Sequence, residues 1–117
     1  MRVTLEETLA KTNIMVIDGS MSTALEALGC DLNDSLWTAK ILAEQPDLVR
    51  QVHLNYFRAG ADCGITASYQ ATIPGLTARG YSLKEAEDCI ARSVELFLEA
   101  RKSWWAQEGR DSGRAMP

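Results

Sequence analysis

The sequence predicts an α/β protein in which helices alternate with two parallel strands. Two short apolar runs, residues 14–17 and 61–67, are bounded by turn residues as strands are. The stretch between them is far longer than a hairpin loop and contains apolar residues at helical spacing. This order favours parallel strands joined by a right-handed crossover. Two such strands complete neither a barrel nor a doubly wound sheet, so we expect part of a larger architecture.

The two predicted strands differ in strength. Residues 14–17 read Ile-Met-Val-Ile, an unbroken apolar run that is typical of a strand buried on both faces. Residues 61–67 give a weaker prediction, because Gly64 lowers strand propensity.

Helix signals surround both runs. A capping box of Thr4 and Glu7 predicts a short helix over residues 4–11, and Ser82 with Glu85 predicts the strongest helix, from there to about residue 105. Between them the pattern predicts helices over residues 21–28, which stop at Gly29, over a brief piece from 35 to 42, and over residues 47–58, with Pro46 at the first position and a stop at Gly60. Pro74 and Gly75 are expected to break the chain.

The end of the sequence changes character. We expect residues 1–106 to form the folded segment and residues 107–117 a polar tail. Trp104 and Trp105 carry large apolar surfaces just before that tail, and nothing after them in the sequence is an obvious cover.

Composition limits the function classes. The chain has 117 residues, 46% hydrophobic and 24% charged, and a net charge of −4, which suits one globular domain. No block of Lys and Arg is present, so nucleic acid and anionic membranes are not expected partners. No apolar stretch is long enough to cross a bilayer and no signal peptide is recognisable, so we expect a cytoplasmic protein. Three scattered cysteines agree with a reducing compartment.

The first candidate site follows the first predicted strand. Asp18 leaves the end of that strand, where it could bind the ammonium group of an amino acid. The turn of Gly19, Ser20 and Met21 could offer backbone N–H groups to the carboxylate of the same ligand. Equally, Asp18 or Ser20 could simply cap the next helix.

The second candidate site follows the second predicted strand. Alternation would bring Thr66, Ser68 and Gln70 to one side, with Thr72 nearby, where they could orient a small polar ligand. The alternative is a solvated loop rich in Ser and Thr. His53 is expected to be a partly buried surface residue rather than a base, and no Ser-His-Asp or Cys-His set is recognisable. We therefore predict no catalytic nucleophile from the protein.

Three strings carry a family resemblance: VIDGSMSTALEALGCDLNDSLWTAK, PDLVRQVHLNYFRAGAD and ITASYQAT. They resemble the opening of the homocysteine S-methyltransferase family, close to bacterial and plant members that use S-methylmethionine, over residues 13–101. The resemblance implies the N-terminal part of a (β/α)8 TIM barrel, a fold that typically needs about 250 residues. It also implies methyl transfer from S-methylmethionine or S-adenosylmethionine to homocysteine, which yields methionine.

The resemblance also implies site residues and a cofactor. Asp18 would bind the substrate amino group, the turn from Gly19 to Met21 its carboxylate, and Thr66 would lie in the homocysteine pocket. Ser68, Gln70 and Thr72 would line the mouth. Family members activate the homocysteine thiol on a zinc ion held by three cysteines. Those positions are not occupied by Cys30, Cys63 and Cys89, so no metal ligand is expected on this chain.

These expectations lead to a divided prediction. The family reaction is zinc-dependent methyl transfer, whereas this chain alone is expected to be inactive. The alternatives are a non-catalytic amino-acid-binding or regulatory remnant and, from another class, a flavodoxin-like signalling receiver with an acid at a strand end. That receiver fold needs five strands, and the sequence shows two. Open sheet edges would favour self-association.

Overall fold

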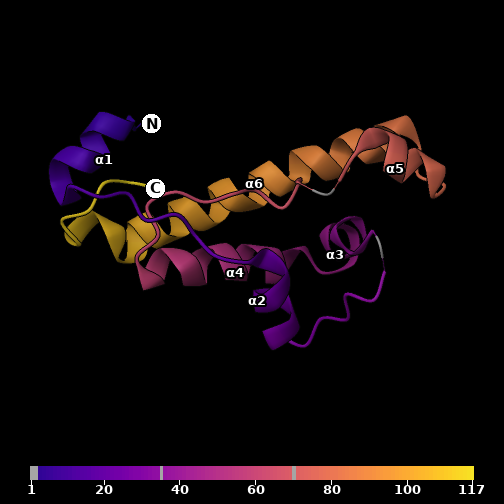
Figure 1. The fold of residues 1–117 in the computed structure, drawn as a ribbon, viewed down its shortest axis with the longest axis horizontal. Coiled ribbons are helices and arrows are strands. Elements are labelled where there is room, and N and C mark those ends of the chain that lie inside the picture. Colours follow the sequence, from indigo (N-terminus) through magenta and orange to yellow (C-terminus); the bar gives the residue numbers. More distant parts are fainter. Residues whose placement is uncertain (1–2, 35, 70) are drawn as a thin grey trace.

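The computed structural model describes residues 3–34, 36–69 and 71–117 and shows an elongated, helical molecule of 46 × 28 × 22 Å (Figure 1). The long helix α6 runs along most of its length, beside α4. In chain order the helices are α1 (Leu5–Thr12), α2 (Met21–Ala27), α3 (Trp37–Glu44), α4 (Pro46–Ala59), α5 (Ile73–Ala78), α6 (Leu83–Gln107) and the 3₁₀ turn η1 (Gly109–Asp111).

The prediction of two parallel strands in an α/β barrel fragment is wrong for the described part of the chain, which contains no strand or sheet. The two apolar runs do lie beside each other, joined by a single parallel bridge between Ile17 and Cys63. Ile14 and Ile17 remain 64% and 62% exposed. A strand buried on both faces needs neighbours at its edges and layers over its faces, and here the helices cover the runs incompletely. We call residues 14–18 with residues 61–66 the bridged segments.

The helix predictions are largely confirmed because their signals are local. Both capping boxes form, at Thr4 with Glu7 and at Ser82 with Glu85. Helix α4 begins with Pro46 and ends at Gly60, whose φ of 117° suits glycine. The predicted break at Pro74 is wrong, since Pro74 lies in the first turn of α5, where a missing N–H costs no helical bond.

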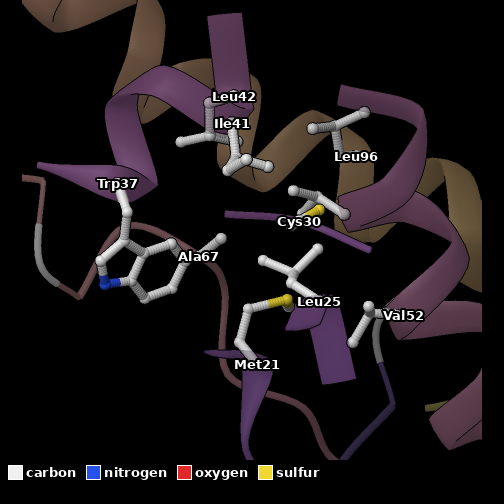
Figure 2. Packing of buried hydrophobic residues seen from close by; sticks show 10 residues of the cluster. Met21, Leu25, Cys30, Trp37, Ile41, Leu42, Val52, Ala67 and Leu96 are labelled. Atoms are coloured by element: carbon white, nitrogen blue, oxygen red, sulfur yellow. The ribbon is translucent and has the colours of Figure 1, made fainter. Parts of the chain in front are cut away.

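Helices α2, α3, α4 and α6 enclose the main hydrophobic core (Figure 2). Leu25 of α2, Val49 and Val52 of α4 and Leu96 of α6 are fully buried there. A second cluster joins the end of α4 to the end of α6, with Phe57 stacked edge to face on Phe97 at 5.4 Å. Helix α6 therefore supports the whole molecule, because α3, α4 and α5 all pack on it.

The segment after α6 turns back onto the second cluster. Trp104, expected to lack a cover, is only 1% exposed, because Phe57, Trp105 and the Arg114 guanidinium surround it. Arg114 lies 4.8 Å from the centre of the indole. Within the described ranges, no helix is long and apolar enough to cross a membrane.

Candidate functional site

Asp18 lies immediately after the bridge and is tied to the opposite segment at two points. Its backbone N–H donates to the Cys63 carbonyl at 3.0 Å, and its Oδ2 accepts from the Ile65 N–H at 3.3 Å. Oδ1 is buried and has no hydrogen-bond partner among the described residues. Burial raises the pKa of Asp18, and the bond from Ile65 opposes that shift. The site thus holds a partly desolvated carboxyl group with one oxygen left to accept.

The following turn is fixed by Tyr56 of α4. The Tyr56 hydroxyl donates to the Ser20 carbonyl at 2.8 Å, and a Cβ at Gly19 would stand 2.7 Å from that hydroxyl oxygen. Glycine is therefore needed for this close approach. The Ser20 side chain accepts from the Thr23 N–H at 3.1 Å and caps α2, while the Met21 side chain is buried in the main core. Capping, the alternative for this loop, applies to Ser20, and Asp18 binds Ile65 instead.

The second candidate loop meets the first through Ile65. Thr66 follows that residue, and its hydroxyl lies 2.8 Å from the Ser68 hydroxyl. The Thr72 side chain instead accepts from the Gly75 N–H and caps α5. Gln70 lies outside the described residues. The bond from Ile65 thus ties Asp18 to the backbone next to Thr66, whereas the Thr72 side chain caps α5.

Gly64 explains how closely the two loops approach. A Cβ at this position would stand 2.5 Å from Phe97 Cε2 and 3.1 Å from Asp18 Oδ2. Phe97 thus packs on the backbone of the second loop, and Asp18 reaches Ile65 past a residue that has no side chain. Gly64, which weakens the strand prediction, thus leaves the space that the Asp18 carboxylate occupies.

The prediction that His53 is a partly buried surface residue is wrong. His53 is fully buried, with its ring edge to face with Phe97 at 5.0 Å and with neither ring nitrogen hydrogen-bonded within the described structure. Burial lowers its pKa from 6.5 to about 4. Its spacing of four residues from both Val49 and Phe57 is the signal that could have placed it inside.

Asp62 is a buried carboxylate that the sequence pattern does not single out. Its carboxylate is buried, accepts from the Val16 N–H at 3.0 Å and lies 3.4 Å from the Arg114 guanidinium. An acid inside a predicted strand is the sequence signal that could have identified it, because a buried carboxylate needs a charged or hydrogen-bonding partner.

A shared metal site does not fit the cysteines. Cys30 is buried in the main core with its thiol 3.8 Å from Gln45 Oε1, Cys89 belongs to α6 and packs against the buried clusters, and Cys63 lies in the bridged segments. Burial raises the pKa of Cys30 and Cys89, which disfavours the thiolate that zinc binds. Across residues 3–34, 36–69 and 71–117, no group of three His, Cys, Asp or Glu side chains could hold a metal.

Comparison with known sequences gives a consistent match. Residues 15–111 match the sequence profile of the family described as homocysteine S-methyltransferase. The chain is 54% identical to the Bacillus subtilis homocysteine S-methyltransferase YbgG over 104 residues, which are 89% of this chain and 33% of that protein. It is 51% identical to homocysteine S-methyltransferase 1 of Zea mays over 92% of this chain and 34% of that protein.

Solved structures agree. The oxidized form of the homocysteine methyltransferase MmuM from Escherichia coli superimposes with a TM-score of 0.87 at 48% identity, over 96% of this chain and 38% of that one. The metallated form gives a TM-score of 0.83 at 51% identity, over 89% of this chain and 36% of that one. The chain spans about a third of the length of the curated relatives it matches.

Proposed function

Because the chain belongs to the homocysteine S-methyltransferase family, we propose that it contributes the amino-acid-binding part of an enzyme that methylates homocysteine to methionine. The methyl donor would be S-methylmethionine or S-adenosylmethionine. In that reaction the homocysteine sulfur attacks the methyl carbon, the carbon–sulfur bond of the donor breaks, and the donor leaves as a thioether. No protein nucleophile is needed.

The observation that supports this proposal is the unpartnered oxygen of Asp18. A buried carboxylate oxygen without a donor costs free energy, and an ammonium group would supply the missing hydrogen bond with opposite charge. Partial burial strengthens that attraction relative to bulk water. Asp18 would therefore hold the amino group of homocysteine.

The other predicted residues complete the proposed site. Backbone N–H groups of Gly19, Ser20 and Met21 would hold the substrate carboxylate at the start of α2. Thr66 would contact the side chain of homocysteine, with Ser68 beside it at 2.8 Å between hydroxyl oxygens. Gln70 and Thr72 would line the mouth, and Thr72 would do so while it caps α5.

Activation of the sulfur is not assigned to this chain. The resemblance implies zinc in the family, but the dispersed and partly buried cysteines do not fit such a site here. We infer that this chain alone binds the amino acid and does not turn it over. The same dispersion of the cysteines favours the second candidate function, a non-catalytic amino-acid-binding or regulatory remnant.

Calorimetry with L-homocysteine tests the proposed binding site. We expect heat of binding for the wild-type chain and about a tenfold or greater loss of affinity in Asp18→Asn, which keeps the side-chain shape but removes the charge. Asp31→Asn is the matched control, because Asp31 is an exposed carboxylate that also accepts one backbone N–H, that of Asn33. Equal affinity of the two variants would refute the role of Asp18. Methyl transfer by the purified chain would refute its inactivity.

Self-association is a further part of the proposal. The described residues contain no sheet edge, so self-association cannot proceed by pairing of sheet edges in this part of the chain. The bridged segments instead expose the apolar side chains of Ile14, Ile17 and Ile65. Burial of that surface between copies would favour a dimer. Sedimentation over a range of protein concentrations tests this, and a monomer at all concentrations would exclude it.

A further inference from the structure

One side chain of the segment after α6 reaches three parts of the molecule. The Arg114 guanidinium donates to the Phe57 carbonyl at 3.2 Å and to the Ala61 carbonyl at 2.8 Å. It also lies over Trp104 and 3.4 Å from Asp62 Oδ1. Arg114 therefore connects the end of α4, the end of α6 and the second bridged segment.

Asp62 extends this connection to the first bridged segment. Its Oδ2 accepts from the Val16 N–H at 3.0 Å, and its own N–H donates to the Val16 carbonyl at 2.7 Å. Both polar backbone groups of Val16 are thus bonded to one residue. The Asp62 side chain is only 5% exposed, so water solvates its negative charge poorly. The Arg114 guanidinium supplies the positive counter-charge.

Asp18 follows Val16 by two residues and depends on the same register. Its N–H bonds Cys63, which is next to Asp62, and its Oδ2 receives the N–H of Ile65. Hydrogen bonds, together with the short stretches of backbone between them, therefore connect Arg114 through Asp62 and Val16 to the carboxyl group of the proposed site.

We propose that Arg114 is a positioning residue, which holds Asp62 on Val16 and thereby orients Asp18 toward the ammonium group of the amino-acid substrate. The effect of Arg114 on substrate binding rests on the proposed function of Asp18. Arg114 suits the task because a planar guanidinium reaches several acceptors at once, whereas a lysine ammonium is a point charge. Without the guanidinium, the buried Asp62 carboxylate loses its counter-charge, and the pairing with Val16 weakens.

Amide hydrogen exchange by NMR on the full chain tests the linkage without any ligand. In Arg114→Ala we expect the amides of Val16, Asp18 and Ile65 to exchange about tenfold or more faster. The amides of Val52 and Leu96, in the main core, should keep their wild-type rates. Arg110→Ala is the matched control, because Arg110 is an exposed arginine of the same C-terminal segment and should change none of these rates.

Every outcome of this experiment decides the question. Faster exchange at Val52 and Leu96 to the same degree would overturn the proposal, since Arg114 would then support the whole fold. Unchanged exchange at Val16 and Asp18 would overturn it as well. If Arg114→Ala does not fold, Asp62→Asn is read in the same way, since its amide oxygen can still accept from Val16 but has no charge for Arg114.

Affinity for L-homocysteine separates this inference from the proposed function. Arg114→Ala should bind the amino acid about tenfold more weakly than Arg110→Ala does. Local loosening with unchanged affinity would overturn the positioning role. If the wild-type chain binds no L-homocysteine, the proposed function fails, while the exchange rates still decide whether Arg114 fixes the bridged segments.

Discussion

The paired ends of α4 and α6 and the bridged segments are both rich in apolar residues, yet only the first region is well buried. Phe57 at the end of α4 is 1% exposed, and Phe97 and Trp104 of α6 pack around it. Ile17 in the bridged segments is 62% exposed. The difference lies in what covers each region, because each helix presents its apolar stripe to the other, whereas the helices cover the bridged segments only in part.

This comparison shows where the stability of the chain resides. Helices satisfy their backbone hydrogen bonds internally and need only one apolar face covered. An extended segment needs a backbone partner at its edge and a packed layer over its face before its apolar side chains are buried. The bridged segments have a few backbone hydrogen bonds, the Asp62 carboxylate and the packing of Ala61 and Gly64, so polar contacts position them to a larger degree than they position the helices.

The largest expected effect comes from Phe57→Ala. Phe57 is fully buried among Phe97, Trp104 and the neighbouring residues of the second cluster, so truncation leaves a cavity. We expect the free energy of unfolding to fall by about 3–5 kcal/mol. Urea denaturation measures this value, with Leu98→Ala as the control, because Leu98 lies on the exposed side of α6 at 47% exposure. Equal losses in the two variants would contradict the packing described for this region.

The next effect is a loss of stability on acidification, caused by His53. The pKa of His53 is about 4 in the folded chain and 6.5 in the unfolded chain. Between pH 6.5 and pH 4 the unfolded state therefore binds a proton that the folded state does not. The contribution of His53 to stability is therefore lost as the pH falls from 6.5 to 4. At roughly 1.4 kcal/mol per pKa unit, that loss amounts to about 3 kcal/mol.

His53→Leu is the variant that isolates this titration. Leucine fills the apolar site against Phe97 and cannot take up a proton, so its free energy of unfolding should depend less on pH between 6.5 and 4 than that of the wild type. Asp18 acts in the opposite sense, because its raised pKa favours the protonated folded state on acidification. Parallel pH profiles for wild type and His53→Leu would show that His53 is not buried as a neutral ring.

A smaller effect is expected at the start of α6. The Ser82 side chain accepts from the Glu85 N–H at 3.1 Å, and Ser82→Ala removes that cap. We expect a loss of about 1 kcal/mol in the free energy of unfolding, since α6 supports the other helices. Ser82→Asp keeps a capping oxygen and should retain most of the stability. A loss in Ser82→Asp as large as in Ser82→Ala would mean that the cap is not the cause.

The same contrast explains what the sequence could predict. Caps and stops at Thr4, Ser82 and Gly60 were found because the groups that they bond lie within a few residues. The strand over residues 14–17 was predicted from composition, but its burial depends on partners that no local pattern records. Of the site, the sequence indicates Asp18 and Thr66 as candidates. It does not single out Asp62 and places His53 wrongly at the surface, because their partners Arg114 and Phe97 come from distant positions.

The smallest effect on stability is expected from Ile17→Ser in the bridged segments. Ile17 is largely exposed, so Ile17→Ser removes little packing and should change the free energy of unfolding by no more than about 0.5 kcal/mol. The same change removes apolar surface that the proposed self-association would bury. Ile17→Ser should therefore dissociate at higher protein concentration than the wild type in sedimentation, while its urea midpoint stays the same. A loss of several kcal/mol would mean that Ile17 is covered within the folded chain, and the contrast between packed helices and incompletely covered bridged segments would no longer hold.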